Sequence, residues 1–197
     1  MREMIRMVLA ITILAAASGL LLAMVKNGTE AQIEAQKLKF VKGPVLNDIL
    51  QNAANDPLAD RFKLTVDGEE KTFFVAKYDG KPKVVAFESF GSGYGGTLGV
   101  MVAVDTETDK IWGIGVTTHS ETPGLGARSK TDPNFAAGFK GLSVAETHKV
   151  KNDGGDVDAL SGATITSRGV VGAVNKAGEL YMANKSEILD KARTLVH

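Results

Sequence analysis

The chain has 197 residues, 44% of them hydrophobic, which suits one domain with a buried core and an additional segment. Its 23 basic and 23 acidic side chains balance, and no basic cluster or aromatic stacking platform occurs, so we predict no nucleic-acid partner. The chain has no cysteine, which excludes disulfides, iron–sulfur clusters, thiolate zinc sites and cysteine nucleophiles. Any redox chemistry must come from a bound organic cofactor.

An uncharged run of 19 residues, MVLAITILAAASGLLLAMV, occupies positions 7–25. As a helix it matches the thickness of the hydrocarbon core of a membrane, so we predict a transmembrane anchor over residues 1–26, in contact with membrane lipid. A cleaved signal peptide is the alternative, because AAASG at 15–19 resembles a cleavage region, although the apolar run continues beyond it. Arg2 and Arg6 precede the run, and Lys26 is the only close positive charge after it until Lys37, so we predict the N-terminus inside and the rest of the chain outside. The expected location is the inner (cytoplasmic) membrane, crossed once, with the domain on the periplasmic, extracytoplasmic side.

Residues 27–60 have polar helical character, with a second short helix from Pro44, and we interpret them as a stalk or packing segment. From residue 61, short β-branched and aromatic runs alternate with DG, DGKP and DTETDK turns, which is typical of antiparallel hairpins. Strands are expected at 61–66, 71–80, 81–90, 97–106 and 110–119, and helices at 132–139, 168–184 and 186–196.

This order predicts an α+β fold: one N-terminal transmembrane helix, then a single domain over residues 61–197 with an antiparallel sheet and packed helices. The three histidines, His119, His148 and His197, have no metal-ligand spacing, and no metal site is predicted. We interpret His148 and His197 as solvent-exposed and assign no role to His119.

The stretch SGATITSR at 161–168 carries four hydroxyl side chains just before a predicted helix that begins near Ser167 or Arg168. One hydroxyl suffices to cap a helix, and no glutamate completes a capping box, so the surplus indicates another role. A helix N-terminus with a nearby arginine favours a phosphate. The stretch therefore predicts a phosphate-bearing ligand near residues 164–167, with a helix cap as the alternative.

A second unusual segment is HSETPGLG at 119–126. Its Pro-Gly pair forms a tight turn, and Gly124 and Gly126 allow the main chain to approach a flat or bulky ligand closely. Leu125 would then offer an apolar contact. The alternative is an ordinary loop in which Thr122 caps a helix and Pro123 takes its first position.

Both segments resemble signatures of the FMN-binding domains of two membrane redox complexes, Rnf and the Na⁺-translocating NADH:quinone oxidoreductase. SGATITS resembles the flavinylation motif S/T-G-A-T-x-T, and ETPGLG resembles the second signature. The GYGG turn and the strands VMVAVD and KIWGIGV resemble the core strands between them. The overall length and the short segment before the domain are more similar to the G subunit of the Rnf complex than to the longer C subunit of the quinone reductase.

The resemblance implies FMN as cofactor, joined through its phosphate to Thr166 by a phosphoester bond, with Arg168 as a further charge partner without an assigned role. A threonine hydroxyl is a weak nucleophile without a base, and no histidine lies near Thr166 in sequence, so a separate flavin transferase using FAD and Mg²⁺ is implied for maturation. The implied FMN contacts are Ser161, Gly162, Ala163 and Thr164 in the turn, and Glu121, Thr122, Pro123, Gly124, Leu125 and Gly126 against the isoalloxazine ring.

The resemblance also implies an electron-transfer subunit with no catalytic residues of its own. Its partners would be the other membrane and redox subunits of a complex in which ferredoxin reduces NAD⁺. This electron transfer would drive the translocation of Na⁺ or H⁺. Two alternatives stay open. One is a flavoprotein of the quinone reductase or of another extracytoplasmic electron-transfer chain, and the other is an anchored binding domain without redox function.

Overall fold

The computed structural model describes residues 1–195, which form two compact units, residues 1–40 and the chain from Val41 onward. His197 and the end of the helix predicted at 186–196 lie outside the described residues. In the first unit, α1 (Arg2–Lys37) is one helix of 36 residues with none buried, and it is long and apolar enough to cross a membrane. The Thr12 hydroxyl donates to the Val8 carbonyl, which satisfies a polar group within the apolar helix. A π-helical segment, η1 (Leu38–Lys42), follows α1.

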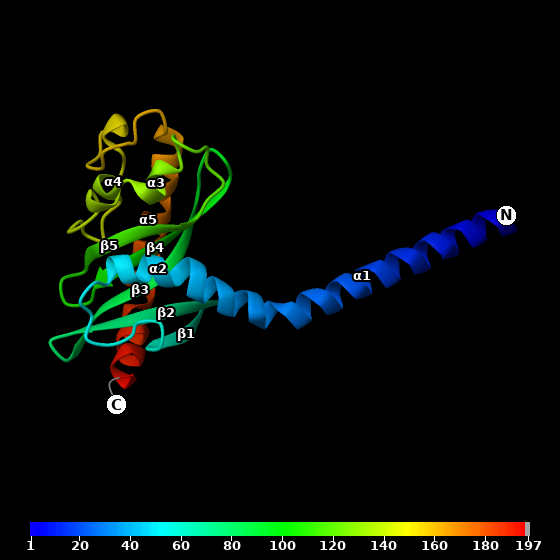
Figure 1. The fold of residues 1–197 in the computed structure, drawn as a ribbon, viewed down its shortest axis with the longest axis horizontal. Helices are drawn as coiled ribbons and strands as arrows, with labels where there is room; N and C mark the ends of the chain where they lie inside the picture. The colour runs from blue at the N-terminus through cyan, green and yellow to red at the C-terminus, as the bar shows by residue number, and fades with distance from the viewer. Residues whose placement is uncertain (196–197) are drawn as a thin grey trace. The chain divides into compact units, whose positions relative to one another are not determined.

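The second unit is built around a five-stranded antiparallel sheet in which neighbours in sequence are neighbours in space (Figure 1). This confirms the predicted hairpin meander. Two of the predicted turns are tight: Asp67 and Gly68 have φ of 53° and 80°, and Asp79 and Gly80 have 53° and 75°, as two-residue hairpins with Asp-Gly prefer. The strands are β1 (Arg61–Val66), β2 (Glu69–Tyr78), β3 (Lys81–Ser92), β4 (Thr97–Asp105) and β5 (Lys110–Thr118).

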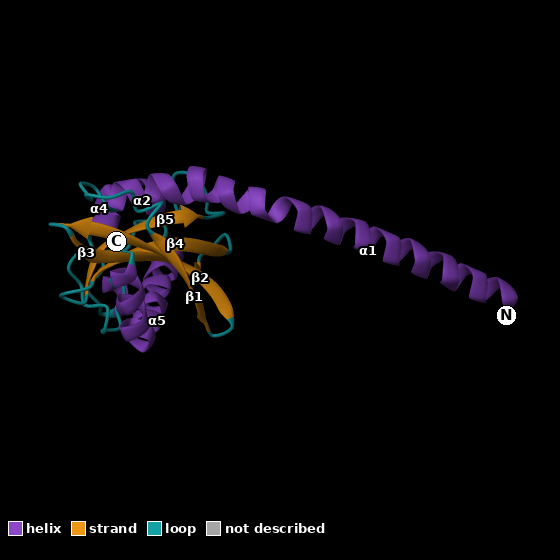
Figure 2. Cartoon of the chain, turned by 90° about the horizontal axis from the view of Figure 1, so that it is seen from below, coloured by secondary structure: helices purple, strands orange, loops and turns teal. Residues whose placement is uncertain are grey.

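The two faces of the sheet are covered by different helices: α2 (Gly43–Ile49) on one and the long α5 (Thr164–Thr194) on the other (Figure 2). The α2 face depends on small residues in β5, since a Cβ at Gly115 would lie 2.5 Å from Val45 Cγ1. The α5 face holds the main core, in which aromatic and branched strand side chains pack against one stripe of the helix. Members of this core include Phe73, Phe87, Val100, Val102, Val170, Val174, Ala177, Tyr181 and Ile188.

Helix α5 differs from the sequence expectation in two ways. It runs unbroken where two helical runs, 168–184 and 186–196, were predicted, because the single residue between them, Lys185, is a good helix former and not a glycine or proline. It also begins at Thr164, ahead of the predicted start, which places the hydroxyl residues 164–167 inside its first turn. The short helices α3 (Arg128–Thr131), α4 (Pro133–Ala137) and the 3₁₀ turn η2 (Lys151–Asp153) precede it.

A close backbone contact places the start of α5 against the end of β3. A Cβ at Gly91 would overlap the Gly169 carbonyl oxygen, and a Cβ at Gly169 would lie 2.5 Å from the Ser92 carbonyl oxygen. Glycine at both positions therefore lets helix and strand touch through main chain. The first turn of α5 is held in this way beside the turn at 93–96.

Candidate functional site

A cavity of about 490 Å³ opens at the first turn of α5, against the loop at 119–126 and the turn at 93–96. Its volume falls in the range of small-molecule sites, about 300–1,000 Å³. It brings the two sequence motifs together, although Ser161, Pro123 and Gly124 do not line it. Tyr94 of the GYGG turn and Ile165 of the SGATITS stretch also line it, although the sequence analysis gave neither side chain a role. The lining residues are Tyr94, Glu121, Thr122, Leu125, Gly126, Gly162, Ala163, Thr164, Ile165 and Thr166.

The first turn of α5 presents backbone donors to this cavity. The first helical hydrogen bond is from Ser167 N to Ala163 O, 3.0 Å, so the N–H groups of residues 164–166 have no acceptor within the helix. No side chain caps the helix; Ser167 Oγ instead accepts from Leu160 N at 2.9 Å and donates to Ala163 O at 3.0 Å. The hydroxyl groups are therefore not caps, and the helix start keeps its partial positive charge toward the cavity.

Thr166 points to a carboxylate. Its Oγ1 donates to Glu121 Oε2 at 2.6 Å, and Gly95 N donates to the other carboxylate oxygen at 2.9 Å. Thr166 is 1% exposed and Glu121 is 6% exposed. Within residues 1–195, no lysine, arginine or histidine forms an ion pair with Glu121. The carboxylate is thus held by two hydrogen-bond donors alone in the described part of the chain.

Glycines enclose this pair. A Cβ at Gly126 would lie 2.7 Å from Thr166 Oγ1 and would overlap Glu121 Oε2, and a Cβ at Gly93 would overlap Glu121 Oε1. At Gly162, φ is +77° and a Cβ would lie 3.1 Å from Leu125 Cδ2. Gly93, Gly126 and Gly162 therefore have a steric reason: they leave room for the carboxylate, the hydroxyl and the apolar wall of the cavity.

Large side chains stand at the opening of the cavity. Tyr94 is 75% exposed, Leu125 47% and Ile165 49%. Exposed apolar and aromatic surface beside a concave site suits a flat ring that covers it. The cavity therefore combines an anion-binding helix start with a surface for an aromatic ligand.

The loop at 119–126 is a turn, not the start of a helix. The Thr122 carbonyl accepts from Leu125 N and Ala127 N, both at 3.2 Å, and α3 begins only at Arg128. The alternative in which Thr122 caps a helix is therefore wrong. Ser129 Oγ donates to Gly126 O at 2.7 Å, which fastens the end of the turn. His119 contributes Nδ1 as acceptor for the Glu121 backbone N–H at 3.2 Å.

Arg168, the further charge partner that the resemblance implied, is engaged elsewhere. Its Nε and NH2 groups each donate to Asp153 at 2.7 Å, and Arg168 does not line the cavity. The hydrogen bond from this guanidinium holds the pKa of the Asp153 carboxyl below its ordinary value. The two residues therefore form a surface ion pair beside the site.

His148 is buried, so its interpretation as a solvent-exposed residue is wrong. Asn175 on α5 accepts from His148 N and donates to His148 O, both at 2.9 Å. The ring Nε2 lies 2.8 Å from Ser143 O. These hydrogen bonds to Asn175, 27 positions along the chain, hold the His148 backbone against α5.

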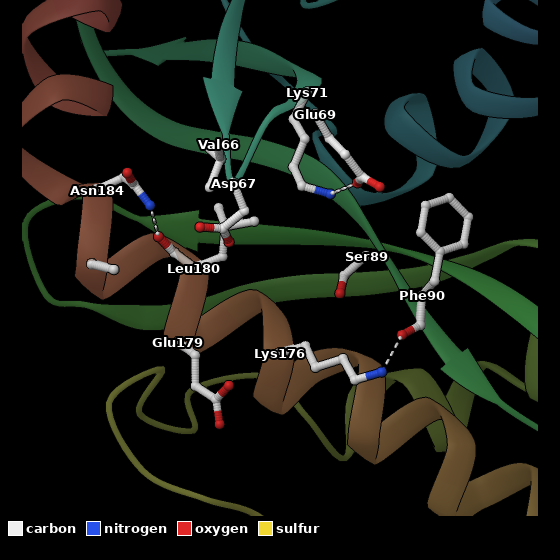
Figure 3. A pocket seen from close by; sticks show the side chains of 11 residues that line it. Val66, Asp67, Glu69, Lys71, Ser89, Phe90, Lys176, Glu179, Leu180 and Asn184 are labelled. Carbon is white, nitrogen blue, oxygen red and sulfur yellow. Dashed lines mark hydrogen bonds and ion pairs between the residues drawn. The ribbon is translucent and has the colours of Figure 1, made fainter.

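A larger cavity, about 690 Å³, lies between the β1–β2 turn, β3 and α5 (Figure 3). None of the predicted site residues lines it. Lys71 pairs with Glu69 at 3.3 Å, and Lys176 donates to the Phe90 carbonyl at 3.4 Å. Its wall carries mixed charges and faces the middle of α5 instead of its start, so this cavity has no comparable anion site.

Known proteins are similar to this chain over the region that contains the cavity. The family model described as "FMN-binding domain" matches residues 93–179, which include both loops and the first turn of α5. Among the solved structures that are similar to this chain, two are each 26% identical to it. One is the C subunit of the Na⁺-translocating NADH-quinone reductase from Parabacteroides distasonis (77% of this chain, 93% of that chain, TM-score 0.59), and the other is NqrC from Shewanella oneidensis (69% and 71%, TM-score 0.53).

Curated relatives, each named as the G subunit of an ion-translocating oxidoreductase complex, match over most of their length. The protein from Cereibacter sphaeroides is 35% identical (87% of this chain, 81% of the relative), and that from Vibrio parahaemolyticus 34% (93% and 92%). The protein from Methanosarcina acetivorans is 32% identical (93% and 97%). The chain therefore belongs to the family of G subunits of the ion-translocating oxidoreductase complex, and it carries an FMN-binding domain.

Proposed function

We propose that this protein is the electron-carrying flavoprotein subunit of an Rnf-type complex, with FMN attached through a phosphoester bond to Thr166. The observation that carries the proposal is the placement of the Thr166 hydroxyl at the first turn of α5, on a cavity whose helical N–H groups lack acceptors in the helix. Bound FMN supplies the electron-transfer chemistry that a chain without cysteines lacks.

The residues present fit such a cofactor. The backbone N–H groups of Thr164, Ile165 and Thr166, with the helix dipole, would hold the phosphate without a side-chain cation. Leu125, Ile165 and Tyr94 would cover the isoalloxazine ring. Covalent attachment would keep the cofactor on the domain outside the cytoplasm.

The proposed setting is a single-pass subunit anchored in the cytoplasmic membrane by α1, with the FMN domain on the extracytoplasmic side. Lipid and the other subunits of the complex would surround the anchor, and a flavin transferase would load FMN from FAD with Mg²⁺. In the complex, electrons would pass from ferredoxin to NAD⁺, and this transfer would drive the translocation of Na⁺ or H⁺. This subunit alone would not catalyse the overall reaction.

Attachment is tested by expressing the full chain with a flavin transferase and examining it on a denaturing gel for flavin fluorescence. The wild type should fluoresce and carry the added FMN-phosphoryl mass on the peptide containing Thr166, whereas Thr166→Ala should carry none. Thr164→Ala, a threonine lost from the same helical turn, is the matched control and should stay labelled. A colourless wild type would contradict the proposal, and label on Thr166→Ala would move the attachment point.

Orientation is tested with single cysteines, which the cysteine-free chain makes unambiguous. Lys81, exposed at the start of β3, and Arg2, exposed at the start of α1, are suitable positions. In intact cells a membrane-impermeant maleimide should label Lys81→Cys and should label Arg2→Cys only after lysis. The reverse pattern contradicts the extracytoplasmic placement.

A further inference from the structure

A threonine hydroxyl needs a base before it becomes a useful nucleophile. The chain has no histidine near Thr166 in sequence, but the fold places a carboxylate oxygen of Glu121 2.6 Å from Thr166 Oγ1. We propose that Glu121 is the general base for flavin attachment, so that the acceptor protein itself removes the proton from its own threonine. This inference rests on the proposed attachment of FMN at Thr166.

The geometry meets the first requirement of a general base, which is hydrogen-bond reach to the proton that it removes. An O–H···O⁻ distance of 2.6 Å is in the range of charge-assisted hydrogen bonds. The Gly95 N–H bond to the other oxygen fixes the plane of the carboxylate, and the spaces at Gly93 and Gly126 admit it. Glu121 is thus aimed at the reacting oxygen before any flavin arrives.

The surroundings of Glu121 leave its oxygen available. Among residues 1–195, only a main-chain N–H and the Thr166 hydroxyl donate to the carboxylate, and His119, whose ring contacts the Glu121 backbone, accepts a hydrogen bond there. Because the Thr166 hydroxyl donates to Glu121, the lone pairs of Oγ1 are not used by that bond. Thr166 also lines the cavity at the start of α5, which is the space from which a flavin phosphate would approach Oγ1.

The chemical step balances with FAD as the flavin donor. Thr166 Oγ1 forms a bond to the flavin-side phosphorus, the bond from that phosphorus to the bridging oxygen breaks, and AMP leaves with the electron pair. The hydroxyl proton passes from Thr166 to Glu121 Oε2 and then to water. Threonine and FAD thereby give the FMN ester, AMP and one proton.

Glutamine at position 121 separates chemistry from structure. Its single carbonyl oxygen would keep the Gly95 N–H bond, and its amide nitrogen would then face Thr166 and donate to Oγ1. Size and both hydrogen bonds are preserved, but the direction of the bond to the hydroxyl is reversed. A purely structural Glu121 would tolerate this change, whereas a base would not.

The experiment uses the full chain, made without a transferase and purified in detergent, to which transferase, FAD and Mg²⁺ are added. The initial rate of flavin attachment is measured by in-gel fluorescence at several concentrations of this protein, and the attached flavin is confirmed by intact mass. We expect Glu121→Gln to lower the kcat of flavin attachment by about 10²-fold or more, which is the usual contribution of a general base. The KM of the transferase for this protein should be unchanged. Glu88→Gln is the matched control, because Glu88 also contacts a threonine hydroxyl, Thr117, but does not line the cavity.

A second measurement guards against misfolding. In Glu121→Ala, added formate should restore attachment while formamide should not, because both fill the gap but only formate accepts a proton. Equal rates for wild type and Glu121→Gln, or equal rescue by both small molecules, would overturn the role of Glu121 and leave attachment itself intact. No label on the wild type would overturn the attachment and this role together.

Discussion

The domain contains two glutamate–threonine pairs that look alike chemically and differ in their surroundings. Glu88 on β3 contacts the Thr117 hydroxyl, and its other oxygen pairs with Lys42 at 3.0 Å. Glu121 contacts the Thr166 hydroxyl, and its other oxygen accepts from a backbone N–H. The first pair is closed by a cation, whereas the second opens on the cavity at the start of α5.

The difference teaches that position in the fold, and not residue type, separates a carboxylate with a structural role from one proposed to act as a base. Lys42 stands just before α2, so the Glu88 pair ties this helix start to the central strand of the sheet. Among residues 1–195, Glu121 pairs with no cation, and Gly93 and Gly126 leave the space that its carboxylate occupies. If the two pairs divide their tasks in this way, changes at one should alter attachment and changes at the other only stability.

The largest effect is expected at Gly126. In Gly126→Ala the new methyl group would lie 2.7 Å from Thr166 Oγ1, and flavin attachment should fall about 10²-fold because the reacting atoms are displaced. Overpacking should also lower the free energy of unfolding by about 1–3 kcal/mol. The rate is measured by in-gel fluorescence and stability by urea unfolding. Gly172→Ala, where a Cβ meets nothing within 4 Å, is the control and should attach flavin normally.

Removing the cation of the other pair should affect stability only. Lys42→Met leaves the Glu88 carboxylate, whose side chain is 13% exposed, with the Thr117 hydroxyl as its partner. We expect the free energy of unfolding to fall by about 3 kcal/mol, because a mostly buried charge loses its counter-ion. Flavin attachment should keep its wild-type rate, and slower attachment would contradict the separation of the two pairs.

Removing each hydroxyl compares the pairs directly. Thr166→Val takes one of two donors from Glu121 and should lower the free energy of unfolding of the flavin-free protein by about 2 kcal/mol. Thr117→Val leaves Glu88 its lysine and should cost about 1 kcal/mol. Both changes in the free energy of unfolding are to be measured by urea unfolding of the full chain in detergent. A larger loss for Thr117→Val would reverse our ranking of the two sites.

The smallest effect is expected at Arg168. Its guanidinium lowers the pKa of Asp153 below the ordinary value of 3.8, so the stabilisation by this pair is present above pH 3.8 and is lost as pH falls further. Arg168→Ala should therefore be slightly less stable than wild type at neutral pH and equal to it in acid. Unfolding curves across pH test this, with Asp153→Asn as the matching change. Flavin attachment should not change, because the side chain is outside the cavity.

The sequence alone determined the features that depend on local backbone preference and periodicity. Alternating strands with Asp-Gly turns predicted the antiparallel meander, and the uncharged run at 7–25 predicted the apolar helix. The resemblance of the two motifs predicted an FMN-binding domain, and the overall length with the short segment before the domain predicted the G subunit; the comparisons confirm both. The start of α5 was misplaced because no side chain caps it, so the usual local signal of a helix N-terminus is missing.

Only the tertiary structure decided which side chains meet. Glu121 and Thr166 are 45 positions apart, and no pattern in either segment indicates that one accepts a hydrogen bond from the other. Arg168 looked like a phosphate partner from its place in the motif, but the fold pairs it with Asp153. Such partners depend on how strand and helix ends are brought together, here through the glycine contact between β3 and α5. The local sequence does not predict that contact between β3 and α5, because the contact arises from packing across the whole sheet.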